Sequence, residues 1–100
     1  MKIWIKGATS PRMESPRHDY WSIDDATDQA VSWMKDNLSQ GIEDFELEIN
    51  KALDKPKFWR TLDEKVAEAD ISYDIKKSDK SFDDHYYYMY LGTRDTDSRR

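Results

Sequence analysis

The segment that most restricts the fold of this chain is the uncharged run YYYMYL, residues 86–91. Tyrosine packs well on the pleated surface of a sheet, so the run predicts a β-strand. Side chains alternate between the two faces of a strand, which places Tyr86, Tyr88 and Tyr90 on one face. The simpler interpretation is a core strand whose hydroxyls reach water. The alternative is a strand that presents one tyrosine face as a binding surface, and the sequence does not say which face that is.

A second strand is predicted just before this run. Ile71, Tyr73 and Ile75 alternate with polar residues, the period expected of a half-buried strand. Residues 77–81 are all polar and contain no Asn-Gly or Asp-Gly pair, which favours a longer loop over a tight turn. We therefore expect an antiparallel hairpin over residues 71–91 as the scaffold of the domain.

The N-terminal part predicts a short strand followed by a loop. Residues 2–6 predict a strand with Ile3 and Ile5 on one face and Trp4 on the other, and Gly7 is expected to end it. Residues 8–20 contain Pro11 and Pro16, and proline disfavours helix in the residue before it, so we expect a mobile loop. His18 falls in this loop, where a solvated imidazole is expected.

Two helices are predicted in the middle of the chain. Ser22 is a helix-capping residue, apolar side chains follow at helical spacing over residues 24–40, and Gly41 is expected to end this helix. A second helix is predicted to start at Asp54 or at Thr61 and to continue to residue 68.

Residues 42–53 fit either a strand or a helix. The alternation of apolar and acidic residues in FELEI, residues 45–49, favours the strand. The order strand, helix, strand, helix, strand, strand predicts an α+β fold. We expect a small, mostly antiparallel sheet of about three or four strands with two amphipathic helices on one face. Residues 1–92 are expected to form a single domain and residues 93–100 a disordered polar tail.

The sequence favours a protein without catalytic activity. It has no cysteine, so disulfides and thiol nucleophiles are excluded, and its three glycines do not form a phosphate-binding loop. Nothing suggests a cofactor. Asp83, Asp84 and His85 are metal-ligand types, but strand alternation brings at most two of them together. A divalent-metal-dependent enzyme that uses Asp83 and His85 is therefore kept only as an alternative.

Charge favours a basic protein partner over nucleic acid. The formal net charge is −5, and residues 42–70 hold nine acids against five bases. An acidic surface repels the phosphates of nucleic acid but attracts a basic protein, such as a nucleic-acid-binding protein. Binding to this chain could inhibit such a partner. No apolar run reaches membrane-spanning length, and a chain without cysteine fits the reducing cytoplasm, where we expect it to act.

The predicted partner-binding residues are aromatic anchors and acids that steer association: Tyr86, Tyr88, Tyr90, Trp59, Glu43, Asp44, Glu46, Glu48, Asp63 and Glu64. A second hypothesis is that single-stranded nucleic acid stacks on an exposed tyrosine face beside Lys76, Lys77 and Lys80. The identity of the partner, the source organism and the oligomeric state do not follow from the sequence.

Overall fold

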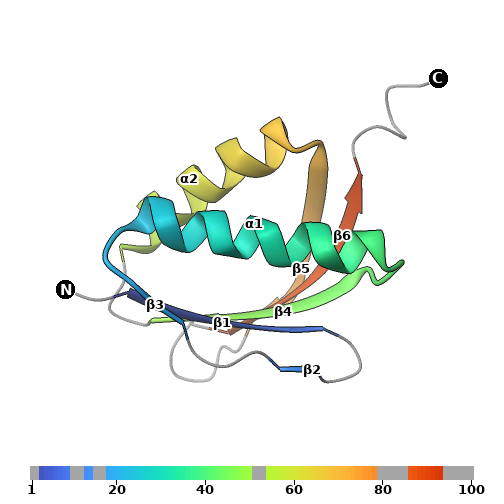
Figure 1. The fold of residues 1–100 in the computed structure, drawn as a ribbon, viewed down its shortest axis with the longest axis horizontal. Helices are drawn as coiled ribbons and strands as arrows, with labels where there is room; N and C mark the ends of the chain where they lie inside the picture. The colour runs from blue at the N-terminus through green and yellow to red at the C-terminus, as the bar shows by residue number, and fades with distance from the viewer. Residues whose placement is uncertain (1–2, 10–12, 15–17, 51–53, 79–85, 94–100) are drawn as a thin grey trace.

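The computed structural model describes residues 3–9, 13–14, 18–50, 54–78 and 86–93. The fold is α+β, as predicted, with one antiparallel sheet in one layer and both helices packed on the same side of it (Figure 1). The elements in chain order are β1 (Ile3–Thr9), β2 (Met13–Glu14), β3 (His18–Tyr20), α1 (Ile23–Ser39), β4 (Asp44–Ile49), α2 (Lys55–Glu68), β5 (Ile71–Ser78) and β6 (Tyr86–Thr93). The C-terminal hairpin of β5 and β6 was predicted.

The sheet is wider than the sequence predicted. Its strand order is β2-β1-β4-β6-β5, and every neighbouring pair is antiparallel. β3 also pairs with β1. It lies on the same side of β1 as β2, at the other end of the strand, and β4 lies on the opposite side of β1. The short strands β2 and β3 therefore share one edge position, and the sheet is five strands wide instead of three or four.

The segment 8–20 was predicted as a loop, and the structure corrects this. β1 continues past Gly7 to Thr9, and both β2 and β3 lie within the segment. Proline constrains only itself and the residue before it, so the residues between Pro11 and Pro16, and those after Pro16, were free to pair. His18, expected to be solvated, belongs to β3 and is partly buried.

The core lies between the sheet and the helices. Burial alternates along β4, which confirms that FELEI is a strand. The same alternation in β6 buries Tyr87, Met89 and Leu91 toward the helices and turns Tyr88 and Tyr90 to the other face. The buried apolar side chains are Ile3, Ile5, Phe45, Leu47, Ile49, Ile71, Tyr87, Met89 and Leu91 from the sheet and Ala26, Ala30, Val31, Met34, Phe58, Leu62 and Val66 from the helices.

The ends of α1 follow the predicted capping signals. The Ser22 hydroxyl accepts a hydrogen bond from the Asp25 backbone N–H at 3.1 Å. At the other end Gly41 adopts φ +78, and the Ile42 N–H reaches the Asn37 carbonyl at 2.8 Å. This is a Schellman ending, in which a left-handed glycine lets the chain satisfy the last helical carbonyls.

The start of α2 was one of the two predicted positions. The Asp54 carboxylate accepts the Lys57 backbone N–H at 3.1 Å, and Pro56 lies in the first turn. Just after the helix and its C-cap Ala69, Asp70 has φ 59, a left-handed conformation that glycine adopts with less strain. Among the helices of the described ranges, none combines the length and the apolar character that a bilayer span requires.

The two helix ends predict mutational effects of opposite sign. Gly41→Ala should destabilise the fold by about 1 kcal/mol, because alanine is strained at positive φ. Asp70→Gly should stabilise it by about 0.5 kcal/mol, because relief of strain exceeds the added freedom of the unfolded chain. Urea unfolding of both variants checks this, and effects of the same sign would contradict it.

Candidate protein-interaction surface

The face of the sheet opposite the helices carries aromatic and acidic side chains in direct register. Antiparallel pairing places Glu46 across from Tyr88 and Asp44 across from Tyr90. Side chains directly opposite one another in such a pair are close enough to interact. We call this surface the helix-free face, and it consists of Trp4, Lys6, Asp44, Glu46, Glu48, Asp74, Lys76, Tyr88 and Tyr90.

Each described tyrosine of this face donates a hydrogen bond to a carboxylate. The Tyr88 hydroxyl donates to Asp44 Oδ1 at 2.8 Å, and the Tyr90 hydroxyl donates to Glu43 Oε1 at 2.5 Å. The hydrogen bond to Asp44 raises the pKa of Tyr88, and the bond to Glu43 raises the pKa of Tyr90. Both phenols therefore remain neutral donors through the physiological pH range. The bonds hold each ring beside a carboxylate.

Cations of the chain itself already approach this surface. Lys76 Nζ lies 5.0 Å from the centroid of the Tyr90 ring, and Lys6 Nζ lies 3.9 Å from Glu48 Oε1. The face of an aromatic ring and a carboxylate oxygen both attract ammonium and guanidinium groups. The arrangement is thus chemically suited to cationic side chains.

The structure brings together six of the ten predicted site residues on or beside the helix-free face: Glu43, Asp44, Glu46, Glu48, Tyr88 and Tyr90. The backbone of Tyr86 pairs with Glu48, at a position of β6 that alternation assigns to the same face. The side chain of Tyr86 lies outside what the structure describes. The other three residues belong to α2, in the opposite layer.

Trp59 is placed in the edge of the core instead of on the interaction surface. Its ring packs edge-on against Tyr87 at 4.8 Å and Phe58 at 5.2 Å between centroids, and the side chain is partly buried. Trp59 therefore contributes to the packing of α2 on the core. It is not part of the helix-free face, which lies on the other side of the sheet.

Asp63 and Glu64 also lie apart from the other acids. Asp63 accepts a hydrogen bond from the Tyr73 hydroxyl, which ties α2 to β5. Burial, followed by this bond, raises the pKa of Tyr73. Glu64 is exposed on α2. Since the two residues are in the helical layer, a partner on the helix-free face would not contact them.

Tyr73 predicts an alkaline limit to stability. Its pKa is raised on folding, so its contribution is complete below the unfolded tyrosine pKa of about 10 and is lost as pH rises through the folded pKa. We expect the free energy of unfolding to fall above about pH 10. Tyr73→Phe should flatten this decline, as measured by urea unfolding across pH. An equally steep decline in the variant would contradict the assignment.

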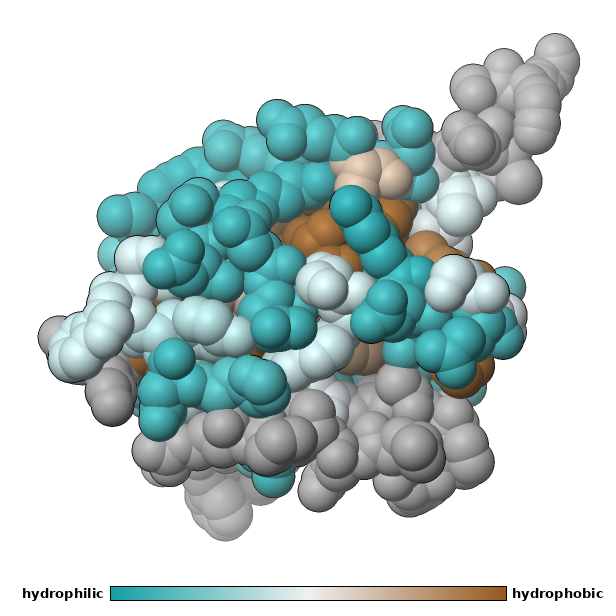
Figure 2. All heavy atoms as spheres, viewed as in Figure 1, coloured by the Kyte–Doolittle hydropathy of each residue, from teal (hydrophilic) through white to brown (hydrophobic). Residues whose placement is uncertain are grey.

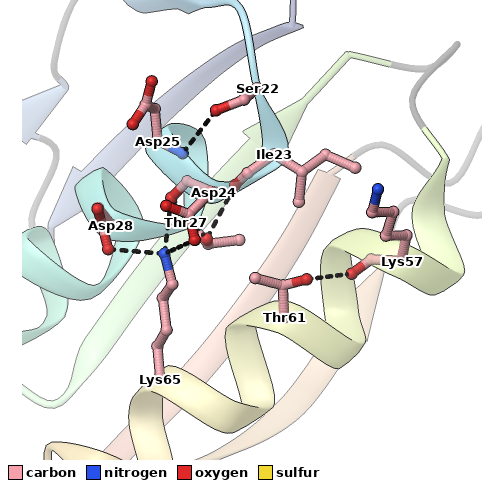
Figure 3. A network of polar contacts seen from close by, with 9 residues as sticks. All are labelled: Ser22, Ile23, Asp24, Asp25, Thr27, Asp28, Lys57, Thr61 and Lys65. Atoms are coloured by element: carbon pink, nitrogen blue, oxygen red, sulfur yellow. Dashed lines mark hydrogen bonds and ion pairs between the residues drawn. The ribbon is translucent and has the colours of Figure 1, made fainter.

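A separate acidic cluster at the start of α1 contacts α2 through a lysine (Figure 3). Lys65 Nζ donates to Asp28 Oδ1 and to the Asp24 carbonyl, both at 2.7 Å, and lies 2.9 Å from Asp24 Oδ1. Burial lowers the pKa of Lys65, but its bonds to Asp28 and Asp24 outweigh this and raise it overall. The single lysine offsets part of the negative charge of the exposed Asp24, Asp25 and Asp28, and its bonds join the two helices.

A groove of about 450 Å³ lies between the two helices near this lysine. Figure 2 shows hydrophobic atoms at the bottom of the hollow between the helices and hydrophilic side chains around it. The lining side chains are Asp28, Val31, Ser32, Lys35, Lys65, Glu68 and Ala69. None of these lining residues is aromatic, so the groove lacks the ring faces with which the helix-free face can contact a cation.

Asp83, Asp84 and His85, which were considered as metal ligands only in the alternative hypothesis, lie outside the described residues, as does Lys80. His18 belongs to β3, and Trp33 of α1 packs edge-on against its ring at 5.4 Å between centroids. The signal that pointed to the helix-free face was alternation in residues 45–49 and 86–91. Comparison of the chain with protein-family models, with curated proteins and with solved structures found no match.

Proposed function

We propose that this protein is a non-catalytic interaction protein whose helix-free face binds a basic segment of a protein partner. The observation that carries the proposal is the pairing of partly exposed tyrosines with carboxylates, Tyr88 with Asp44 and Tyr90 with Glu43. Glu46 and Glu48 add negative charge along the same strand. We further propose that the protein acts in the cytoplasm and that its binding blocks the partner's own binding site.

The spacing of the rings favours an extended segment of the partner. Tyr88 and Tyr90 are two residues apart on one strand, so their positions repeat at about 7 Å. Alternate side chains of an extended peptide repeat at the same distance. Arginine or lysine at alternate positions could therefore meet a ring and a carboxylate at each step. Lys76 over the Tyr90 ring provides an intramolecular example of this contact.

Single-stranded nucleic acid remains the alternative ligand, because exposed aromatic rings on a sheet can stack bases. The carboxylates of Glu43 and Asp44 accept hydrogen bonds from the tyrosines, and Glu46 lies across from Tyr88. These acids would repel the phosphates that accompany each base. The surroundings of the rings thus support the basic protein partner over the nucleic acid.

The test is a titration of the protein with an oligoarginine peptide, followed by NMR of the backbone amides. We expect shifts concentrated in β4 and β6. Tyr88→Ala and Tyr90→Ala should each weaken binding about fivefold to tenfold, the loss of one cation–π contact. Trp21→Ala is the control, because Trp21 is 73% exposed and lies between β3 and α1, in none of the strands that carry the helix-free face.

Two outcomes would overturn the proposal. The first is equal binding by the wild-type protein and both tyrosine variants. The second is tighter binding of a single-stranded oligonucleotide than of the peptide, lost in Tyr88→Ala, which would favour the alternative ligand.

A further inference from the structure

Strand β5 forms an outer edge of the sheet. It stands at the end of the strand order, and in the described part of the chain it pairs only with β6. An edge strand has backbone N–H and C=O groups on one side that can pair with another strand. Ile75, near the middle of β5, is 44% exposed, one of the few large apolar side chains at the surface of the described chain. This edge is therefore a candidate for strand addition.

The sequence around Ile75 is complementary to itself. If two copies of β5 pair antiparallel with Ile75 opposite Ile75, Asp74 of each copy lies opposite Lys76 of the other. Asp74 and Lys76 are both exposed. Among the described residues the ion pairs join Lys6 with Glu48 and Lys65 with Asp24 and Asp28, and none involves Asp74. Opposite charges at directly facing strand positions stabilise the pairing, and this register provides two such pairs.

We propose that a second copy of this chain pairs along β5, in register about Ile75, and extends the sheet across two molecules. The pairing could run from Ser72 to Ser78 of each copy, and the two Ile75 side chains would cover one another on the helix side of the sheet. Lysines and bulges on an edge strand normally discourage pairing with any other strand, and β5 has Lys76 and a register shift between Ile75 and Lys77. An identical strand meets that lysine with an aspartate, which replaces the charge repulsion with attraction and leaves the bulge as a local irregularity of the pairing.

This geometry has a consequence for the helix-free face. The two-fold axis of an antiparallel edge pair is perpendicular to the sheet, so both copies keep their helices on the same side. The two helix-free faces then form one continuous surface. A partner with two basic segments could engage both copies at once, which raises the apparent affinity without a new type of contact.

Reciprocal charge reversal tests the register. Asp74→Lys places two lysines opposite each other, and Lys76→Asp places two aspartates opposite each other. Each variant alone should self-associate at least about tenfold more weakly than the wild-type protein, because two cross-strand pairs become repulsive. Mixed together they restore both opposite-charge pairs, so a one-to-one heterodimer is expected. Sedimentation equilibrium over a wide concentration range measures all of these associations.

The controls separate register from net charge and from misfolding. Glu64→Lys makes the same charge change as Asp74→Lys on exposed α2 and should leave self-association unchanged. A misfolded variant would not be rescued by mixing, so the mixture also reports on folding. A wild-type protein that stays monomeric up to millimolar concentration overturns the proposal. A mixture of the two variants that does not associate overturns it as well.

Discussion

Reversing two carboxylates on β4, with Glu46→Lys and Glu48→Lys, is expected to slow association with an oligoarginine peptide by about tenfold or more at low salt. Glu46 and Glu48 lie on the helix-free face, where their charges add to those of Glu43 and Asp44 beside the tyrosines. Charges of one sign gathered on one surface steer an oppositely charged ligand toward it. Stopped-flow fluorescence of a labelled peptide measures the association rate.

The matched control has the same change in net charge but in the other layer. Glu64→Lys with Glu68→Lys alters two exposed acids of α2, which packs on the side of the sheet opposite the helix-free face. We expect this variant to bind at nearly the wild-type rate, and we expect the rate of the wild-type protein to fall steeply with added salt. Equal slowing in both variants would mean that net charge alone matters and that the helix-free face is not the site.

The second large effect is expected at Gly7, in the middle of β1. A Cβ atom at this position would lie 2.6 Å from Trp33 Cε3 and 3.0 Å from Trp33 Cδ2. The indole ring has little room to move, because it packs against His18 on one side and Phe45 on another. Gly7→Ala should therefore destabilise the fold by about 1–3 kcal/mol through overpacking.

A double-mutant comparison shows whether Trp33 is the cause. In a Trp33→Leu background the obstructing ring is gone, and Gly7→Ala should become neutral or stabilising by about 0.5–1 kcal/mol, since alanine lowers the entropy cost of folding a strand. Urea unfolding of the four proteins measures the change. An equal effect of Gly7→Ala in both backgrounds would exclude the contact with Trp33 as its origin.

Local patterns in the sequence were sufficient to predict most of the secondary structure. The capping residue Ser22 and the terminating Gly41 set the ends of α1 through contacts within a few residues. Alternation in residues 45–49 and 86–91 predicted β4 and β6 and divided their side chains between two faces. These features depend on backbone geometry and neighbouring residues, which the linear sequence contains.

Contacts between distant segments decided the rest. Alternation sorts Tyr87 from Tyr88 but cannot tell which of them the helices cover, because that depends on where α1 and α2 pack. The acids of residues 43–70 are neighbours in sequence, yet β4 and α2 carry them to opposite layers. The pairing of β1 with β4, and of β2 and β3 with β1, likewise joins backbone groups far apart in the chain. Local residue preferences do not encode such partners, so only the packed fold brings Tyr88, Tyr90 and the β4 carboxylates onto one surface.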